Sequence, residues 1–275
     1  MLSAMKIGFY NTLFALVLAV SAPAALGAGE GIAVGVNPDA VARLNAQDRI
    51  LQVGTDVSVG ERIVTGASGQ VQIIFADNTR LVVGPGSSLV IETYLLASSN
   101  VAQKLTINAL GGSFRFITGN SPKPAYSINT PTAAIAVRGT KFDIIVGSRG
   151  TGVMLYEGAL QLCSPGANCV ELVERCDLGT AVNNGAELIA RANPERSPLS
   201  LQFRYARFQT PLLSDFRVNG ASRCVIEEPE AAPSETTTNG GSTETRQTPQ
   251  TQQTQQTQRT QRTQRTQRTP STTKP

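Results

Sequence analysis

The chain has 275 residues, a formal net charge of +4, four cysteines, and neither histidine nor tryptophan. Lys6 and residues 229–275 account for all of the positive excess, so residues 28–228 are neutral and carry no charge that would attract nucleic acid. The absence of histidine excludes Ser-His-Asp and Cys-His nucleophile systems and imidazole metal sites.

Residues 1–27 have the pattern of a secretory signal peptide. Lys6 supplies the positive start, residues 13–20 form the apolar core, and small residues precede a cut before Ala28. A membrane-spanning helix needs about 20 apolar residues, so the short core favours cleavage over a retained anchor. We therefore expect export to the periplasm or beyond the cell. N-terminal sequencing of the mature protein separates the two readings, because retention of residues 1–27 would favour an anchor.

Residues 28–48 contain glycine and asparagine without a firm period and are predicted to be a lead-in segment. From residue 49 to 190, short apolar–polar alternations recur with turn residues between them, as in an all-β sandwich, barrel or solenoid. No fixed-length repeat is visible, so a regular solenoid does not follow from period alone. Gln70 and Gln72 are predicted to lie on the face opposite Val71, Ile73 and Phe75. The side chains predicted to share the inner faces are Val71, Ile73, Phe75, Leu81, Val83, Leu89, Ile91, Leu105, Ile107, Phe114, Phe116, Ile128, Thr130, Ile135, Val137, Phe142, Ile144, Val146, Val153, Leu155, Leu160 and Leu162.

Two alternating runs within residues 130–146 meet at Arg138-Gly139-Thr140, just before Phe142. Strand interiors disfavour glycine, so Gly139 is predicted to mark a bulge or a bend where backbones come close. Arg138 has two interpretations. It either ties this bulge to carbonyl groups or a nearby acid, or contacts a partner.

All four cysteines fall between residues 163 and 224, and an even count in an exported chain favours disulfides, with three pairings open. The Ser-Pro-Gly-Ala-Asn stretch between Cys163 and Cys169 suits a hairpin turn, which would leave Cys176 to pair with Cys224. That second bridge would close a loop of about 49 residues and contribute about 4 kcal/mol in the chain-entropy account. A structural zinc site is the alternative, although the chain has no Cys-x-x-Cys spacing.

Residues 191–228 are predicted to form a short C-terminal cap. Ser197 suits a helix start, and Leu199, Phe203 and Ala206 would then share one stripe. The same stretch also alternates as a strand would, so both readings stay open, with helix favoured.

Residues 229–275 are rich in Thr, Gln, Arg, Pro, Ser and Glu, have almost no apolar side chains, and are predicted to be disordered. Threonine recurs at every third residue from 248 to 269. In a polyproline-type helix, which has three residues per turn, these threonines would lie along one edge. Arginines would lie along another edge. This stripe is interpreted either as a weak contact for anionic headgroups or as part of a solvated spacer. These arginines are Arg259, Arg262, Arg265 and Arg268.

Paired carboxylates are the remaining catalytic chemistry, with candidates Asp56, Glu61, Asp77, Asp143 and Glu157. Asp143 alternates with Lys141 opposite Phe142, which predicts an ordinary charge pair on the solvent face. Asp77 is predicted to be a turn residue. Glycoside hydrolysis needs two carboxylates about 5–10 Å apart across a cleft, and the sequence establishes no such pair. We therefore expect a protein that is not an enzyme and uses no metal and no cofactor.

Four segments in order resemble the FecR-type domain family: 57–66 (VSVGERIVTG), 69–81 (GQVQIIFADNTRL), 111–116 (GGSFRF) and 130–142 (TPTAAIAVRGTKF). The resemblance covers about residues 50–165. One departure is Asn78, where the family tends to have glycine in the hairpin turn. The resemblance implies an exported β domain over residues 49–190.

The family is best known for signal transducers that join a cytoplasmic sigma-controlling segment, one membrane helix and a periplasmic FecR domain that faces an outer-membrane receptor. Only about a dozen residues precede the apolar segment here, so the transducer role is not carried over. The expected role is a noncatalytic envelope module that binds or scaffolds a protein or glycan partner, without nucleic acid. A membrane-anchored component of a FecR-type regulatory system is the alternative, and a carbohydrate-active enzyme is third.

Overall fold

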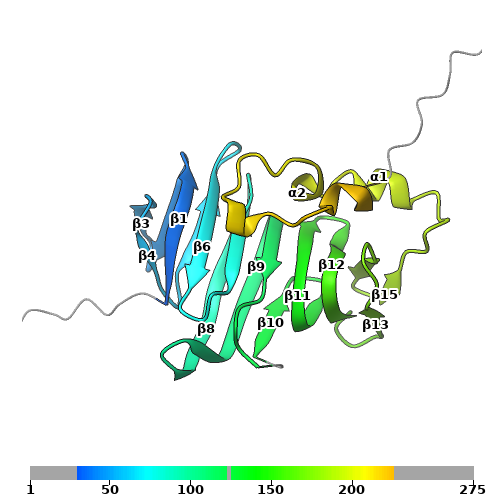
Figure 1. Cartoon of the computed structure of the whole chain (residues 1–275), viewed down its shortest axis with the longest axis horizontal. Helices are drawn as coiled ribbons and strands as arrows, with labels where there is room; N and C mark the ends of the chain where they lie inside the picture. Colours follow the sequence, from blue (N-terminus) through cyan, green and yellow to red (C-terminus); the bar gives the residue numbers. More distant parts are fainter. Residues whose placement is uncertain (1–29, 123–124, 226–275) are drawn as a thin grey trace, which may run out of the picture. The chain divides into compact units, whose positions relative to one another are not determined.

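The computed structural model describes residues 30–122 and 125–225, which form one hydrogen-bonded network of fifteen β-strands followed by short helical turns (Figure 1). The expected all-β class is therefore confirmed. The predicted signal peptide and the Thr/Gln/Arg-rich tail lie outside the described residues.

The strands in chain order are β1 (Gly31–Asn37), β2 (Ala40–Leu44), β3 (Gln47–Ile50), β4 (Asp56–Val57), β5 (Arg62–Thr65), β6 (Gln70–Phe75), β7 (Arg80–Val83), β8 (Ser88–Ser98), β9 (Val101–Ile117), β10 (Tyr126–Asn129), β11 (Ala134–Gly147), β12 (Gly150–Cys163), β13 (Cys169–Leu172), β14 (Leu178–Val182) and β15 (Gly185–Leu188). The helical turns are α1 (Arg196–Ser200), α2 (Arg204–Arg207), η1 (Ser214–Phe216) and η2 (Ala221–Cys224).

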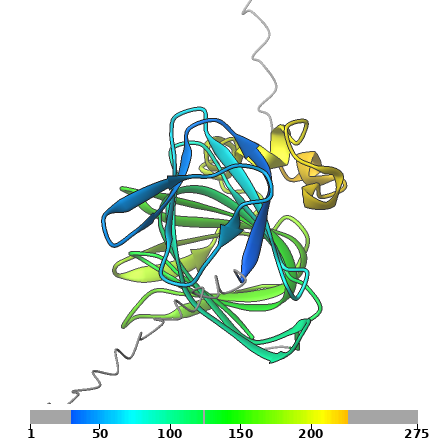
Figure 2. The same ribbon diagram turned by 90° about the vertical axis from the view of Figure 1, so that its left-hand side faces the viewer.

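Three long strands fold this network into two layers. The first half of β9 pairs with β8 and β10, whereas its second half pairs with β7 and β11. β11 pairs with β12 along most of its length, and its first half also pairs with β10. The first half of β12 pairs with β14 and its second half with β13. The first layer therefore runs β4-β1-β6-β7-β9-β11-β12-β14-β15, and the second runs β3-β2-β5-β8-β9-β10-β11-β12-β13. Figure 2 shows the two layers nearly edge-on.

The three bends coincide with glycines that have a left-handed backbone. Gly112, Gly139 and Gly158 have φ values of 107°, 70° and 86°, a region that other residues enter only with strain. The β11–β12 register shifts between Arg138 and Lys141, so the irregularity expected at Gly139 is present. Gly158 lies against it, because a Cβ atom on Gly158 would overlap the carbonyl oxygen of Gly139.

The core fills the space between the layers. Every apolar side chain that the alternation assigns to an inner face is buried in one hydrophobic cluster, whereas Thr130 is only partly buried. Aromatic pairs join the layers, with ring centroids 5.5 Å apart for Phe75 and Tyr94 and 5.8 Å apart for Phe116 and Tyr126. Burial of apolar area on both inner faces is the main favourable contribution to such a sandwich.

Residues 28–48 differ from the expected lead-in segment. The described part of this stretch forms β1 and β2 and begins β3, and β1 pairs with β6 over most of its length. Ala33, Ala40 and Ala42 supply its inward positions. Alanine gives a weak hydrophobic period, which is why the sequence pattern places the start of the sheet too late.

The C-terminal cap contains two short helices instead of one. α1 starts one residue before Ser197, without a side-chain cap, and the chain leaves helical geometry at Phe203 before α2 begins. Phe203 and Ala206 are nevertheless buried together, with Leu199 packed against the same cluster. The predicted stripe is therefore present although the helix is interrupted.

We predict that Gly158→Ala lowers the free energy of unfolding by about 2 kcal/mol or more, because the new methyl group needs both a strained backbone and space held by Gly139. Gly147→Ala is the matched control, since a Cβ there would meet no atom within 4 Å. Urea titrations of both variants measure the effect. Equal stability of the two variants would show that the bend at Gly158 is not a tight backbone contact.

Candidate functional site

Residues 191–225, here called the strap, cross the outward side of the first layer (Figures 1 and 2). The side chains of Phe203, Tyr205, Leu212 and Phe216 are buried beneath it. Tyr205, Leu212 and Phe216 pack with Val82 of β7. The strap therefore covers a face of the sheet that would otherwise meet solvent.

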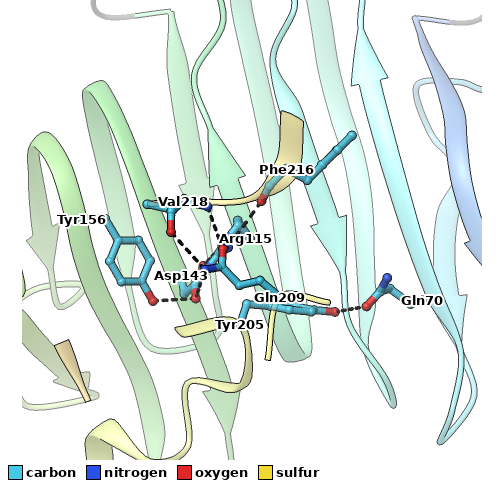
Figure 3. A network of polar contacts seen from close by, with 8 residues as sticks. All are labelled: Gln70, Arg115, Asp143, Tyr156, Tyr205, Gln209, Phe216 and Val218. Carbon is cyan, nitrogen blue, oxygen red and sulfur yellow. Dashed lines mark hydrogen bonds and ion pairs between the residues drawn. The ribbon is translucent and has the colours of Figure 1, made fainter. Parts of the chain in front are cut away.

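A buried ion pair lies under the strap. Arg115 of β9 and Asp143 of β11 stand directly opposite each other in the strand register. Arg115 Nε donates to Asp143 Oδ1 at 2.7 Å and Nη2 donates to Oδ2 at 2.9 Å (Figure 3). Asp143 is 2% exposed and Arg115 is fully buried. This bidentate geometry satisfies both carboxylate oxygens at once.

The strap completes the hydrogen bonding of this pair. Arg115 Nη1 donates to Gln209 Oε1 at 2.5 Å, and the Gln209 amide exchanges two hydrogen bonds with the backbone of Val218. The carbonyl oxygen of Phe216 lies 3.4 Å from the same Nη1. Figure 3 shows these groups converging on the guanidinium from the strap side.

Two glutamines of β6 hold the far part of the strap. Tyr205 Oη donates to Gln70 Oε1 at 2.9 Å, and the Leu213 backbone N–H donates to Gln72 Oε1 at 2.8 Å. Gln70 and Gln72 are almost fully buried. The alternation correctly places them opposite Val71 and Ile73, but the sequence gives no sign that this outer face is covered.

The electrostatics of the network favour one protonation state. Burial by itself lowers the pKa of Arg115, but the Asp143 charge and its hydrogen bonds outweigh burial and raise that pKa overall. Burial, followed by the nearby Asp143 charge, raises the pKa of the Tyr156 hydroxyl, which donates to Asp143 Oδ2 at 2.7 Å. The guanidinium, the carboxylate and the phenol hydroxyl are therefore joined by hydrogen bonds that all close within the fold.

The solvent-face interpretation of Asp143 is wrong. Asp143 does project from the face opposite Phe142, as the alternation predicts, but the strap covers that face there. Lys141, two residues earlier, is partly exposed and forms a salt bridge of 2.7 Å with Glu157. The charge pair expected for Lys141 and Asp143 is thus replaced by two separate pairs, one exposed and one buried.

Asp77 organises a second buried cluster. It occupies the turn after β6, next to Asn78 with its left-handed φ of 65°, as the sequence indicates. It is also fully buried, and its carboxylate accepts from the hydroxyl groups of Ser121 (2.7 Å) and Tyr126 (2.8 Å), and from the Thr79 hydroxyl (2.9 Å) and N–H (3.1 Å). Asp77 therefore fastens the hairpin to the loop before β10 and is saturated by internal donors.

The remaining carboxylate candidates are engaged separately. Glu61 accepts from Arg49 at 2.6 Å and from the Ser58 N–H at 2.9 Å, while Asp56 lies in the two-residue strand β4. Within residues 30–122 and 125–225, no group of three or more Cys, Asp or Glu side chains is arranged to hold a metal ion. The candidates thus form no shared centre.

The Arg-Gly-Thr corner has a backbone role with an exposed arginine. Thr140 is buried, and its N–H donates to Thr118 Oγ1 at 2.9 Å. Phe142 is buried in the core, 5.6 Å from the ring centroid of Phe116. Arg138 is exposed and makes no hydrogen bond or ion pair with any described residue, so it does not tie the bulge together.

The cysteines form two disulfides, Cys163–Cys169 and Cys176–Cys224, which confirms the expected pairing over the zinc alternative. The first bridge closes the hairpin between β12 and β13. The second joins the end of the strap to the segment before β14.

None of the helices in residues 30–122 and 125–225 has the length and hydrophobicity that a membrane span requires.

An open cleft of about 560 Å³ lies between the β11–β12 hairpin, β14 and α1. Its charged lining residues are Arg149 and Glu195. None of the carboxylates considered from the sequence lines it, so the cleft assembles no acid–base pair from those candidates.

We predict that Asp143→Ala destabilises the fold by about 3–5 kcal/mol, because it leaves the Arg115 charge buried without its partner. Asp48→Ala is the control, since the exposed Arg43–Asp48 pair should leave the unfolding midpoint almost unchanged. Thermal and urea unfolding measure both. If Asp143→Ala is as stable as the control, the buried pair is not a structural requirement.

A second prediction concerns tyrosine ionisation. A chain without residues 1–27 keeps four tyrosines, and burial is the largest cause that raises the pKa of each: Tyr94, Tyr126, Tyr156 and Tyr205. A phenol whose pKa is raised on folding stabilises the fold below about pH 10, and this stability is lost as the pH rises further. Near-ultraviolet absorbance should therefore show phenolate only when circular dichroism shows unfolding. Gradual ionisation near pH 10 in a folded protein would contradict the buried placement.

Comparison with known proteins gives one family match. The family model described as FecR protein matches residues 61–161, from the start of β5 into β12. Arg115, Asp143 and Asp77 lie inside this range, whereas the strap lies outside it. No curated protein matches the chain.

Solved structures similar to this chain include two crystal structures of a "putative anti-sigma factor" from Parabacteroides distasonis ATCC 8503, at 1.65 and 2.50 Å resolution. Both have 14% sequence identity and a TM-score of 0.39, and they cover 51% and 50% of this chain. This chain spans 63% and 62% of those chains, less than two thirds of their length. The likeness of this chain to the FecR family therefore rests on the sequence match over residues 61–161.

Proposed function

We propose that this chain is a noncatalytic, exported module of cell-envelope signalling that captures an extended segment of a partner protein along the open edge of β3. Three observations support the proposal. They are the FecR family match, the internal saturation of the buried carboxylates, and the exposed edge described below.

Export is supported by cysteine chemistry together with the leader pattern of residues 1–27. Both disulfides join the segments that follow the FecR domain, and no described cysteine is free. Disulfides persist in oxidising compartments such as the periplasm and are rare in the cytosol.

The noncatalytic role is supported by the hydrogen bonds of the buried carboxylates. Asp143 and Asp77 accept hydrogen bonds from Arg115, Tyr156, Ser121 and Tyr126, all within the fold. A general acid or base needs an accessible lone pair or proton within reach of a substrate, and these groups are covered.

The edges of the two layers differ in how open they are. β4 has only two residues. At the opposite end, the Asn168 side chain exchanges two hydrogen bonds with the backbone of Ala186, which ties β13 to β15. In the described part of the chain, β3 pairs with β2 alone, and all four of its residues are exposed. An unpaired edge of this kind is a template for strand addition.

Exposed aliphatic side chains lie at the end of β3 and next to it. Ile50 at the end of β3 is 72% exposed and Val53 just after it is 68% exposed. Leu44, at the end of the paired strand β2, is also exposed. An unpaired strand edge with exposed aliphatic side chains beside it suits an extended peptide, whose backbone would pair with the edge and whose alternate side chains would give specificity. This is the single observation that carries the proposal, and it favours a protein partner over a glycan.

The test is photo-crosslinking in intact cells with a photoreactive residue at Val53. We expect a discrete crosslinked species that falls several-fold when Ile50→Lys places a charge beside the edge. Leu188→Lys, at the 46% exposed Leu188 of the edge strand β15, is the matched control and should leave the product unchanged. A product that is insensitive to Ile50→Lys, or equally sensitive to Leu188→Lys, would contradict capture at β3.

A further inference from the structure

The positive charge of the folded region is concentrated in the strap. Residues 191–225 contain six arginines and two acids, whereas residues 30–190 contain eleven bases and thirteen acids. From residue 196 to 214 the strap has three arginines and no acid. Arg196 is buried against the carbonyl oxygens of Cys176 and Ile189, so Arg204 and Arg207 are the charges this stretch presents to solvent.

Large apolar side chains are also exposed on the strap. Because Phe203, Tyr205 and Leu212 face the sheet, the exposed residues of the strap lie on its outer side. Phe208 is 55% exposed, and Leu201 and Leu213 are more than one third exposed. The arginine face, as we call this surface, comprises Leu201, Arg204, Arg207, Phe208, Leu213 and Arg223.

A hollow in the arginine face places a cation, an aromatic ring and a hydroxyl together. Arg207, Phe208, Ser222 and Val225 line an open cavity of about 400 Å³. The Arg207 guanidinium carbon lies 5.2 Å from the centroid of the Phe208 ring. The planar guanidinium group is therefore held beside an apolar surface. Guanidinium groups bind phosphate oxygens in a bidentate manner, and a serine hydroxyl adds one donor.

We propose that the arginine face docks on anionic phospholipid membranes. Charge complementarity is the first reason, since basic residues near an anionic surface are attracted to it within a Debye length. The second is that Phe208 lies against the Arg207 guanidinium and that Leu201 and Leu213 are also exposed on the strap, as in surfaces that insert apolar groups between headgroups. An acidic protein would match the charge but would not need this exposed apolar fringe. The proposal is separate from partner capture at β3, which lies on the other layer.

The experiment is cosedimentation of the full mature chain with vesicles of phosphatidylglycerol and phosphatidylcholine in equal amounts. Each arginine near an anionic surface contributes about fivefold in affinity, so Arg204→Gln/Arg207→Gln should weaken binding about 30-fold. The matched control Arg62→Gln/Arg138→Gln removes the same charge from exposed arginines elsewhere and should stay within about twofold of the parent. All of these chains carry the same tail, so tail contributions cancel.

Apolar contact is tested separately. Phe208→Ser should weaken vesicle binding several-fold, whereas Leu95→Ser, at a similarly exposed position of β8, should not. Ile50→Lys should bind vesicles as the parent does, which distinguishes this proposal from capture at β3. Equal losses for the two double-arginine variants, no loss with Phe208→Ser, or binding to polyglutamate but not to vesicles would each overturn membrane docking.

Discussion

The buried pair of Arg115 and Asp143 is the interaction on which the described architecture depends. It lies on the outward face of the first layer, where alternation places polar side chains. Two charges there are tolerated at low dielectric only when they are paired and their remaining donors are bonded. Gln209 and the Phe216 carbonyl group supply those bonds. The ion pair therefore makes the strap a required part of the fold, although the strap lies outside the segment that matches the FecR family.

The geometry of this pair follows from the glycine bends. Arg115 and Asp143 are neighbours only because β9 and β11, which β10 separates in the second layer, pair directly in the first. Gly112 and Gly139 permit those turns, and Gly158 lets β12 follow at close backbone distance. Local backbone freedom at three positions thus fixes the two-layer arrangement and the register that brings the opposite charges together. The same arrangement leaves β3 as an open edge on one layer and the arginine face on the outer side of the strap, so the two proposed contacts use different surfaces.

Much of the fold could be predicted from the sequence because two-residue periodicity reports directly on which side chains face the core. The bend at Gly139 and both disulfides could also be predicted, from residue types whose backbone and covalent chemistry are narrow. The candidate site could not be predicted from the sequence. Alternation shows which face Asp143 occupies, but not whether a distant segment covers that face, and Gln209 is remote in sequence. A signal for Arg115 did exist, since it stands between Phe114 and Phe116 as Asp143 stands between Phe142 and Ile144. Two opposite charges inside apolar runs suggest a pair only once the strand register is known.

Hydrogen exchange of the backbone amides tests the central claim most directly. If the ion pair locks the strap to the sheet, the hydrogen-bonded amides of residues 203–218 should open with nearly the same free energy as those of β9 and β11. In Asp143→Ala the strap amides should then exchange much faster than the strands of the second layer. Rapid exchange of the strap in the unmodified protein, with β9 and β11 fully protected, would contradict the account, because the strap would then be a loosely attached segment that the sheet does not require.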